Sequence, residues 1–377
     1  MNIRDIEAQV LEIPFRLRFK HHSADRSRTQ TILVRTRTLN GHAGFGEGCP
    51  REYVTNETLS GCTAFVQDHA HDLCDNIHSI KDLESWIDQH QHPIDTNPAA
   101  WCAIELSLLD AMSKDLGYSI EETLGTPPLS GAFQYTAVLG NNSRAAFTEL
   151  VKRYVALGFK DFKVKITGET NNDNDKLSLV LKAAPEARIR LDANNIWETA
   201  GEVLAYLSEL SSTPFALEEP LQPRAFNELN GLLETTPVPI IFDESFLNKG
   251  HFDHIDTSND NVFVNVRVSK MGGLIRSRAV ARLLADAHVP IIVGAQVGET
   301  SLLTRAALCL ANEFKDSVIA QEGAFGTLLL ETDITHESLM FGSKGRLVYP
   351  GAAIDMTAHG FEIRYKSDLF STNVLDS

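Results

Sequence analysis

The sequence lacks the features that would place a protein in a membrane, on a secretory route or on nucleic acid. None of its apolar runs approaches the roughly twenty residues of a membrane-spanning helix, and the opening MNIRDIEAQVLEIPF lacks the basic-then-apolar order of a secretory signal. Its 34 Lys and Arg are outnumbered by 50 Asp and Glu, whereas a phosphate-binding surface needs clustered cations. We therefore expect a cytoplasmic protein that has no membrane or nucleic-acid partner.

Cysteine is scarce, and low-complexity linkers and blocks of one charge are absent. The five cysteines are scattered without C-x-x-C or the Cys/His spacing of zinc sites, which predicts reduced, mostly buried thiols instead of disulfides. Of the 377 residues, 43% are hydrophobic and 22% are charged, a globular composition. The length allows two domains, or one large barrel with an attached unit.

Cations are nevertheless gathered in one short stretch, FKDFKVKITG at residues 159–168. If this stretch is a strand, Lys163 and Lys165 point to the same face, because side chains alternate along a strand. Two ammonium groups in one site disfavour each other's protonation, and partial burial adds a desolvation penalty. At least one lysine is therefore expected to have a lowered pKa and to act as a base. The alternative is a solvated basic edge of a strand.

Residues 134–323 alternate short β-rich runs with amphipathic helical stretches. The expected strands are QYTAVLG, DFKVKITG, RIRLDANN, FALEEPL, PIIFDESF, NVFVNVRVS, PIIVGAQ and DSVIAQEG. Eight strand–helix repeats indicate an α/β fold in which a parallel sheet closes into a TIM (β/α) barrel. The competing fold, an open doubly wound sheet, would need a Gly-rich phosphate loop after its first strand, where this sequence has GNNSR.

The segments that flank the barrel have a different pattern. Residues 1–130 combine three strand-like runs with helical segments near 57–90 and 98–116, which predicts a separate α+β unit. The barrel is expected over residues 131–340. The tail, 341–377, is expected to form strand and loop that return to the N-terminal unit.

Active sites of TIM barrels lie at the C-terminal ends of the strands. The expected ends of strands two to six carry Lys165, Asp192, Glu218 or Glu219, Asp243, and Arg267 or Lys270. With Glu218 and Arg267, the successive spacings are 27, 26, 25 and 24 residues, one strand–helix unit each. Three clustered carboxylates repel one another unless a hard cation neutralises them, which predicts a Mg²⁺ or Mn²⁺ site. The competing interpretation is that each acid caps the following helix.

The motifs GFKDFKVKITG, RLDANNIW, LEEP, FDES and NVRVSKMGG occur in this order, with AAWCAIELSLLDAMSKDLGYSIEETLG in the N-terminal unit. Together they resemble the enolase superfamily, in particular its muconate lactonizing enzyme subgroup, over nearly the whole chain. The resemblance implies a modified TIM barrel with an N-terminal capping domain that the C-terminal tail completes. It also implies that Mg²⁺ is bound by Asp192, Glu218 and Asp243, with Asn194 and Glu244 as supporting groups.

In that family a lysine removes the proton next to a substrate carboxylate, and Mg²⁺ stabilises the resulting enediolate. The resemblance therefore makes Lys165 the expected base and Lys163 the neighbour that lowers its pKa. The implied partner is a small carboxylate substrate, and a homo-oligomer is expected.

The chain departs from the family pattern on strand six. Relatives that racemise or epimerise carry a second lysine in a segment N-I-K-x-x-[KR]-x-G-G, and here Arg267 of NVRVSKMGG stands in its place. Arginine stays protonated, so Arg267 is a weak base but a strong clamp for a carboxylate or enediolate. One base suffices for cycloisomerisation or syn-elimination, which predicts a lyase or an isomerase similar to muconate cycloisomerase. The alternatives are racemisation or epimerisation of an N-acyl amino acid or dipeptide, with Lys270 as second base, and a non-catalytic metal-binding scaffold.

Strand eight and two loops bear on the substrate. Dipeptide epimerases of the subgroup show an Asp-x-Asp on strand eight, where this chain has AQEGAFG with Glu322 as its one acid. Glu299 and Glu322 are expected at the barrel mouth. The loops FKHHSADRSRTQ and GCPREYVTNE are expected to select the substrate, and His22, Arg51 and Tyr53 are the candidates for contact with it.

Overall fold

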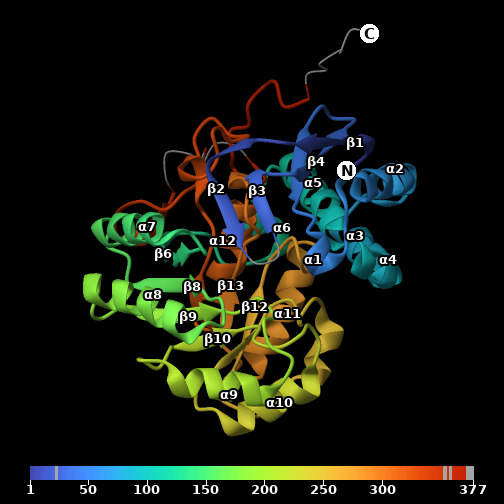
Figure 1. The fold of residues 1–377 in the computed structure, drawn as a ribbon. Helices are drawn as coiled ribbons and strands as arrows, with labels where there is room; N and C mark the ends of the chain where they lie inside the picture. Colours follow the sequence, from blue (N-terminus) through green and yellow to red (C-terminus); the bar gives the residue numbers. More distant parts are fainter. Residues whose placement is uncertain (22–23, 351–354, 356–358, 371–377) are drawn as a thin grey trace.

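Eight parallel strands form the centre of the computed structural model, which describes residues 1–21, 24–350, 355 and 359–370 (Figure 1). They are β7 (Ala137–Leu139), β8 (Asp161–Lys165), β9 (Arg188–Asp192), β10 (Ala216–Glu218), β11 (Ile240–Phe242), β12 (Val262–Val266), β13 (Ile291–Val293) and β14 (Val318–Gln321). Each strand pairs in parallel with the next along the chain. The amide of Thr136, just before β7, donates to the carbonyl of Gln321 at 2.8 Å, so the two ends of the sheet meet. The predicted modified TIM barrel is confirmed.

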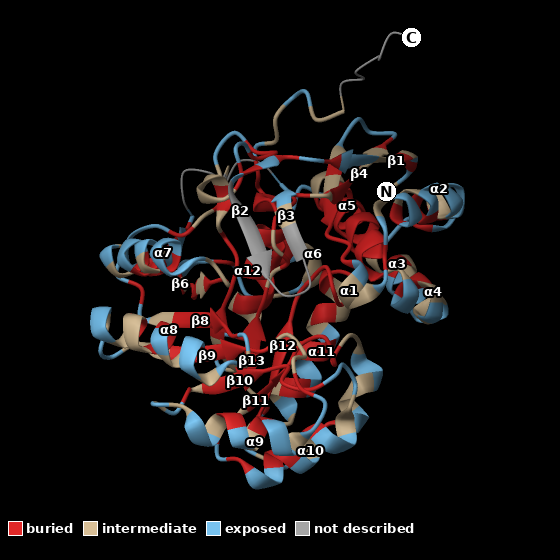
Figure 2. Ribbon diagram, viewed as in Figure 1, coloured by how far each residue is buried: buried red, intermediate tan, exposed pale blue. Residues whose placement is uncertain are grey.

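Helices cover the outside of the barrel, and several of the strands beneath are therefore mostly hydrophobic. Strands β10, β11, β12 and β13 are buried along their whole length. The covering helices are α7 (Arg144–Ala156), α8 (Thr170–Ala183), α9 (Ala200–Glu209), α10 (Phe226–Thr235), α11 (Leu274–Asp286) and α12 (Ser301–Glu313). Ser143 and Thr199 begin α7 and α9 by accepting a first-turn amide. Figure 2 shows α9 and α10 at the bottom of the view, with exposed outer faces and with buried strands on their inner side.

The predicted strand–helix repeat fails at two places. The crossover from β11 to β12 contains the 3₁₀ helix η1 (Lys249–His254) in place of an α-helix. After β14, the described residues form only η2 (Gly326–Leu328), η3 (Ser343–Gly345) and β15 (Arg346–Tyr349). Gly323 and Ala324 have φ angles of +95° and +52°, which a right-handed helix does not allow. The prediction of a helix after strand eight is wrong because the chain turns away there.

A smaller antiparallel sheet and a group of helices precede the barrel. The sheet has the order β1 (Ile3–Leu11), β4 (Thr31–Thr38), β5 (Ala43–Gly48). The helices are α1 (Glu52–Thr55), α2 (Leu59–Asn76), α3 (Ile80–Gln89), α4 (Gln91–Thr96), α5 (Pro98–Leu116) and α6 (Ile120–Leu124). The stretch 19–30, predicted as a loop, belongs largely to a hairpin of β2 (Pro14–His21) and β3 (Ala24–Arg28). Its sequence KHHSADRSR lacks the apolar alternation by which a strand is recognised.

Helix α5 lies directly on β5 because the strand has glycine at alternate positions. A Cβ atom at Gly46 would lie 2.0 Å from the carbonyl oxygen of Ala103, and one at Gly48 would lie 1.9 Å from that of Ala99. Only glycine permits this close approach of two backbones. Figure 2 shows α5 buried over most of its length as a result.

The C-terminal segment contacts the N-terminal unit. The amide of Phe361 donates to Asp110 of α5 at 2.9 Å, and the ring of Tyr365 packs against Phe45 of β5 with centroids 4.4 Å apart. Strand β15 pairs with β6 (Gly131–Gln134), which precedes the barrel. Residues near the two ends of the chain therefore share one part of the core.

The sequence bears on both the burial of the cysteines and the apolar character of the helices. All five cysteines are free in the structure, and four of them are buried, as the prediction of mostly buried thiols expects. Within the described ranges, none of the helices has the length and the apolar character needed to span a membrane.

Candidate active site

Five neighbouring strands bring charged side chains to one end of the barrel. Lys165, Asp192 and Glu218 are the last residues of β8, β9 and β10, where they pair in register. Asp243 and Arg267 directly follow β11 and β12. Because the strands are parallel, these residues meet at the same mouth, and the three carboxylates lie between the two cations in strand order.

The acids do not cap the helices that follow them. Thr199 begins α9 and Asn248 begins η1, and the side chain of each accepts a first-turn amide. Helix α10 begins after Ala225, without a side-chain cap. The interpretation of the three strand-end acids as helix caps is therefore wrong.

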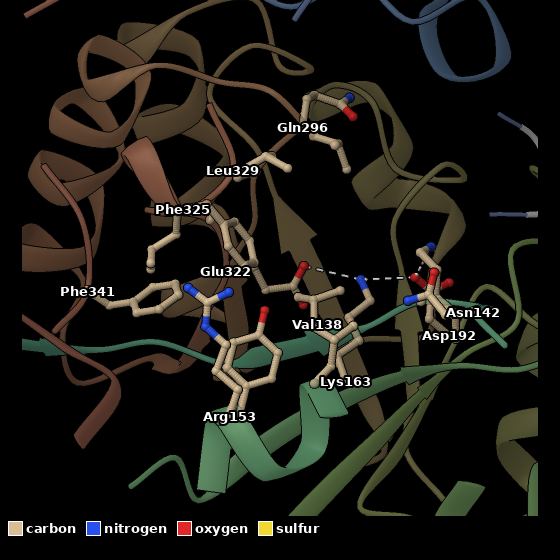
Figure 3. Close-up of a pocket in the computed structure, with 18 of the residues that line it drawn as sticks. Val138, Asn142, Arg153, Lys163, Asp192, Gln296, Glu322, Phe325, Leu329 and Phe341 are labelled. Carbon is tan, nitrogen blue, oxygen red and sulfur yellow. Dashed lines mark hydrogen bonds and ion pairs between the residues drawn. The ribbon is translucent and has the colours of Figure 1, made fainter. Parts of the chain in front are cut away.

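Lys163 lies among three carboxylates. Its Nζ is 2.6 Å from Glu218 Oε1 and 3.2 Å from Asp192 Oδ2. Glu322 Oε2 is also 3.2 Å away, and Figure 3 shows Lys163 between Asp192 and Glu322. Burial opposes the charge of Lys163, but the three carboxylates outweigh it and hold the pKa of Lys163 above its ordinary value. The predicted lowering of a lysine pKa does not hold for Lys163, because it is paired with acids.

Lys165 lies further along β8, at the barrel mouth. Its Nζ is 2.8 Å from Asp192 Oδ2 and donates to Asn194 Oδ1 at 2.5 Å. Asn194 follows β9 with a φ of +48°, a left-handed conformation that asparagine adopts more readily than most residues. Lys165 and Asn194 both line a cavity. The ammonium group is therefore held at a surface that a ligand can reach.

Arg267 stands across the mouth from Lys165. Three strands separate β8 from β12, so in a barrel of eight strands the two residues lie on opposite sides. The guanidinium of Arg267 contacts the carboxylate of Asp243 and donates to Gln296 Oε1 at 3.1 Å. Arg267 also lines the cavity. Any ligand at the mouth would therefore lie between a lysine and an arginine.

Lys270 is directed away from the cavity. Its Nζ donates to the carbonyl of Asp243 at 2.7 Å, to Asp243 Oδ1 at 2.8 Å and to the carbonyl of Asn265 at 2.8 Å. Burial and the charge of Arg267 lower the pKa of Lys270 well below its ordinary value. Its three hydrogen bonds nevertheless hold it against the turn after β12, and it is not part of the cavity lining.

The two adjacent glutamates at the end of β10 have different surroundings. Glu219 accepts the amides of Asp243 and Ser245 at 2.6 Å and 2.7 Å and so holds the turn after β11. Glu218 faces the cluster, where its Oε1 contacts Lys163. Its buried Oε2 has no hydrogen-bond partner in the described part of the chain. Glu218, and not Glu219, thus offers an oxygen to the site.

The chemistry of the carboxylates suits a divalent cation, although cationic side chains pair with them in this arrangement. Among the described residues, no three His, Cys, Asp or Glu side chains converge at ligand geometry. Asp192 contacts two lysines, and Asp243 contacts an arginine and a lysine. Burial and neighbouring acids raise the pKa of Glu244 to about 8, and its Oε2 lacks a partner in the same described set. Buried acids with unpartnered oxygens are the groups that a hard cation satisfies.

A cavity of about 590 Å³ joins this charged cluster to an apolar region (Figure 3). At the charged end it is lined by Lys163, Lys165, Asp192, Asn194, Glu244, Arg267 and Glu322. The apolar region is lined by residues of α7 and by residues that follow β14. The volume is typical of a small-molecule site. The arrangement therefore suits a small anion with an apolar part.

The residues predicted to select the substrate have different locations. Tyr53 lines the cavity, and burial raises its pKa. Arg51 is buried, donates to four backbone carbonyls at 2.5 to 3.3 Å and does not line the cavity. Glu299 accepts the amide of Gln296 at 2.6 Å and does not line the cavity. His22 lies outside the described residues.

Sequence reasoning misses two members of the cluster. Arg190 Nη1 lies 2.9 Å from Glu322 Oε1, and Asn265 Nδ2 donates to Glu218 Oε1 at 3.2 Å. A signal for Arg190 was present, because in RIRLD it shares a strand face with Asp192. Its partner, Glu322, directly follows β14 and is distant in the sequence, so the ion pair could not be predicted from the sequence.

Comparison with known proteins identifies relatives of this chain. Residues 146–352 match the model of the family described as enolase C-terminal domain-like. A hydrophobic dipeptide epimerase of Citrifermentans bemidjiense is 27% identical over 316 residues, which cover 81% of this chain and 84% of that protein. The L-Ala-D/L-Glu epimerase of Bacillus subtilis is 24% identical, with 94% of each chain covered.

Solved structures share the fold over nearly the whole length. A dipeptide epimerase from Cytophaga hutchinsonii, complexed with Mg and D-Ala-L-Val, has a TM-score of 0.84 at 22% identity, with 98% of each chain covered. The 2-chloromuconate cycloisomerase of Rhodococcus opacus has a TM-score of 0.82 at 20% identity, again with 98% of each chain covered. The family match spans more than half of this chain, which therefore belongs to the enolase C-terminal domain-like family and to the enolase superfamily.

Proposed function

We propose that this protein is a Mg²⁺-dependent isomerase or lyase that removes the proton next to a substrate carboxylate and proceeds through an enediolate. The observation that carries the proposal is the position of Lys165, which lines the cavity 2.8 Å from Asp192 and across the mouth from Arg267. A base, an anion-binding cation and a group of acids then surround one small space. Proton abstraction next to a carboxylate needs these three elements.

Asp192, Glu218 and Asp243 would hold the Mg²⁺, and Mn²⁺ has the same ligand preference. The unpartnered buried oxygen of Glu218 supports this assignment, as does the position of the three acids at successive strand ends. Asn194 and Glu244 would support the site. A bound Mg²⁺ supplies the positive charge that stabilises an enediolate. The solved dipeptide epimerase of Cytophaga hutchinsonii contains Mg, which agrees with this choice of ion.

Each cation of the cluster would have a separate role. Lys165 accepts the proton at Nζ, and Asn194 orients that atom through their hydrogen bond. Lys163 stays protonated, since its pKa is held above the ordinary value, and offsets the negative charge of the acids. Arg267 stabilises the charge that develops on the substrate carboxylate.

The arginine on β12 favours a reaction with one base. Arginine side chains are poor proton acceptors, so Arg267 is a poor candidate for the base on the second face. Lys270 would have to break three hydrogen bonds to reach the cavity. Cycloisomerisation and syn-elimination need one base on one face. Both are therefore preferred over racemisation.

Epimerisation or racemisation of an N-acyl amino acid or dipeptide is the second candidate. Its support comes from the relatives, since the Citrifermentans and Bacillus proteins are both named as epimerases. The lowered pKa of Lys270 would suit a second base if its side chain moved. A non-catalytic metal-binding scaffold is the least supported alternative, because a scaffold has no need of Lys165 in the cavity wall.

The test is the exchange of α-hydrogen for deuterium in D₂O with Mg²⁺, measured by NMR over a panel of small carboxylates. Wild-type protein is expected to exchange or convert at least one of them. Lys165→Ala should lose both activities while keeping its fold and its calorimetric Mg²⁺ binding. The exposed Lys152→Ala serves as the control. Near-normal exchange by Lys165→Ala would remove Lys165 as the base. A homo-oligomer stays a prediction, which light scattering can check.

A further inference from the structure

The cavity extends well past the acids and lysines into a region that we name the α7 arm. It is formed by Leu150 and Tyr154 of α7 and by Leu157 just after that helix, together with Phe325, Leu328 and Phe341 of the segment after β14. Figure 3 shows Phe325, Phe341 and Arg153 extending into this part of the cavity. The arm is continuous with the charged end, so one ligand can occupy both.

The arm exists because the eighth strand has no covering α-helix in the described residues. Residues 150 and 154 lie on one face of α7, and Leu157, directly after the helix, continues the same helical spacing. The chain after β14 runs past this face as loop and 3₁₀ helix, and leaves Leu150 and Leu157 half-buried. Phe325 and Leu328 on the other side are also half-buried. Half-exposed apolar side chains on both walls gain free energy when an apolar group fills the space between them.

Charges around the arm disfavour a ligand with a free ammonium group. Glu322, at the end of β14, is already paired with Lys163 at 3.2 Å and with Arg190 at 2.9 Å. Arg153, at the wall of the arm, has no hydrogen bond or ion pair through its guanidinium in the part of the chain that is described. A cationic amine there would meet the guanidinium of Arg153 and the already neutralised Glu322, while the remaining acid of the wall, Glu149, is exposed and lies 3.9 Å from Lys152 Nζ. An apolar chain meets neither penalty.

We propose that the α7 arm binds an extended apolar substituent of the substrate, so that the substrate class is a carboxylate with a long acyl or alkyl chain and no free amine next to it. The proposal rests on the proposed function, since the carboxylate is taken to bind between Lys165 and Arg267. The arm then determines specificity, because short carboxylates fill only the charged end.

The experiment measures calorimetric binding of N-acyl-alanines with increasingly long straight acyl chains, from acetyl to decanoyl, to Mg²⁺-loaded protein. Each added methylene should tighten binding about three- to fourfold until the arm is full, as expected for burial of a CH₂ group. A dipeptide of the same length as a well-bound acyl-alanine, with its free ammonium, should bind at least tenfold more weakly. A dissociation constant that does not change with chain length would overturn the proposal.

Variants locate the effect in the arm. Leu150→Asp and Leu328→Asp place a charge on opposite walls, and each should flatten the dependence on chain length while leaving the binding of acetyl-alanine unchanged. Lys152→Asp, on the exposed face of α7, should keep the full dependence. Two variants are used so that a folding defect in one, visible by circular dichroism, does not decide the result. An unchanged dependence in either folded Asp variant would assign the long chain to another site.

Failure of the arm and failure of the catalytic proposal give different results. Lys165→Ala should keep the dependence of binding on chain length, because Lys165 lies at the charged end, but should lose α-hydrogen exchange. If long-chain ligands bind tightly to wild-type protein and none exchanges, the arm stands and the proposed reaction falls. If acetyl-alanine exchanges and chain length has no effect on binding, the reaction stands and the arm falls.

Discussion

Replacement of Arg267 tests the one-base reaction most directly. Arg267 is buried, contacts Asp243 and lies 3.7 Å from Glu218 Oε1. Met keeps much of its volume and removes its charge and hydrogen bonds. The rate should therefore fall about 10²- to 10³-fold, the usual result when one group that stabilises a developing oxyanion is removed. The fold should persist, because Asp243 keeps its 2.8 Å ion pair with Lys270.

The assay follows α-hydrogen exchange in D₂O separately for the two enantiomers of an accepted carboxylate. Wild-type protein should exchange one enantiomer. Arg267→Lys should keep part of the native activity and add slow exchange of the other enantiomer, because a lysine side chain can release its proton and an arginine side chain cannot. Arg276→Met, which removes an ion pair with Asp95 outside the cluster, is the control. Rapid exchange of both enantiomers by unmodified protein would refute the one-base reasoning and restore the epimerase.

Three further predictions concern the metal site and the core. Asp192→Asn should weaken Mg²⁺ binding severely in a calorimetric titration of chelator-treated protein, and unchanged affinity would remove the metal assignment. Burial raises the pKa of Glu105 to about 7, so the folded state favours the protonated carboxyl. The stability that this proton binding gives to the folded protein is lost as the pH rises from about 4.3 through about 7. Urea unfolding of wild-type protein should therefore show a loss of roughly 3 kcal/mol over this range that Glu105→Gln lacks, with the exposed Glu84→Gln as control. Arg305→Ala removes the ion-pair partner of two buried glutamates and should lower the free energy of unfolding by about 3–5 kcal/mol. Arg144→Ala, which removes an exposed ion pair, should lower it by under about 1 kcal/mol. Equal losses in the two variants would contradict the reasoning.

The sequence by itself determined the barrel and the strand-end positions of the catalytic candidates. A strand–helix unit of nearly constant length sets each strand end, so Lys165 and Asp192 could be placed from spacing, which left Glu218 or Glu219 open for the next strand end. The alternation of side chains along a strand is also a local property of the sequence, and it places Lys163 and Lys165 on one face.

Only the tertiary structure decided the electrostatic state and the shape of the site. The carboxylates of Asp192, Glu218 and Glu322, which come from three other strand ends, hold the pKa of Lys163 above its ordinary value. This reverses the local expectation from two neighbouring lysines. The sequence places Arg51 in a polar loop, where it could contact a substrate, but in the structure its guanidinium donates hydrogen bonds to carbonyls of distant segments. The α7 arm also depends on tertiary structure, because a cavity forms where segments distant in the sequence lie side by side without filling the space between them. Charge pairing and packing sum over neighbours that folding brings together, and no local pattern in the chain records those neighbours.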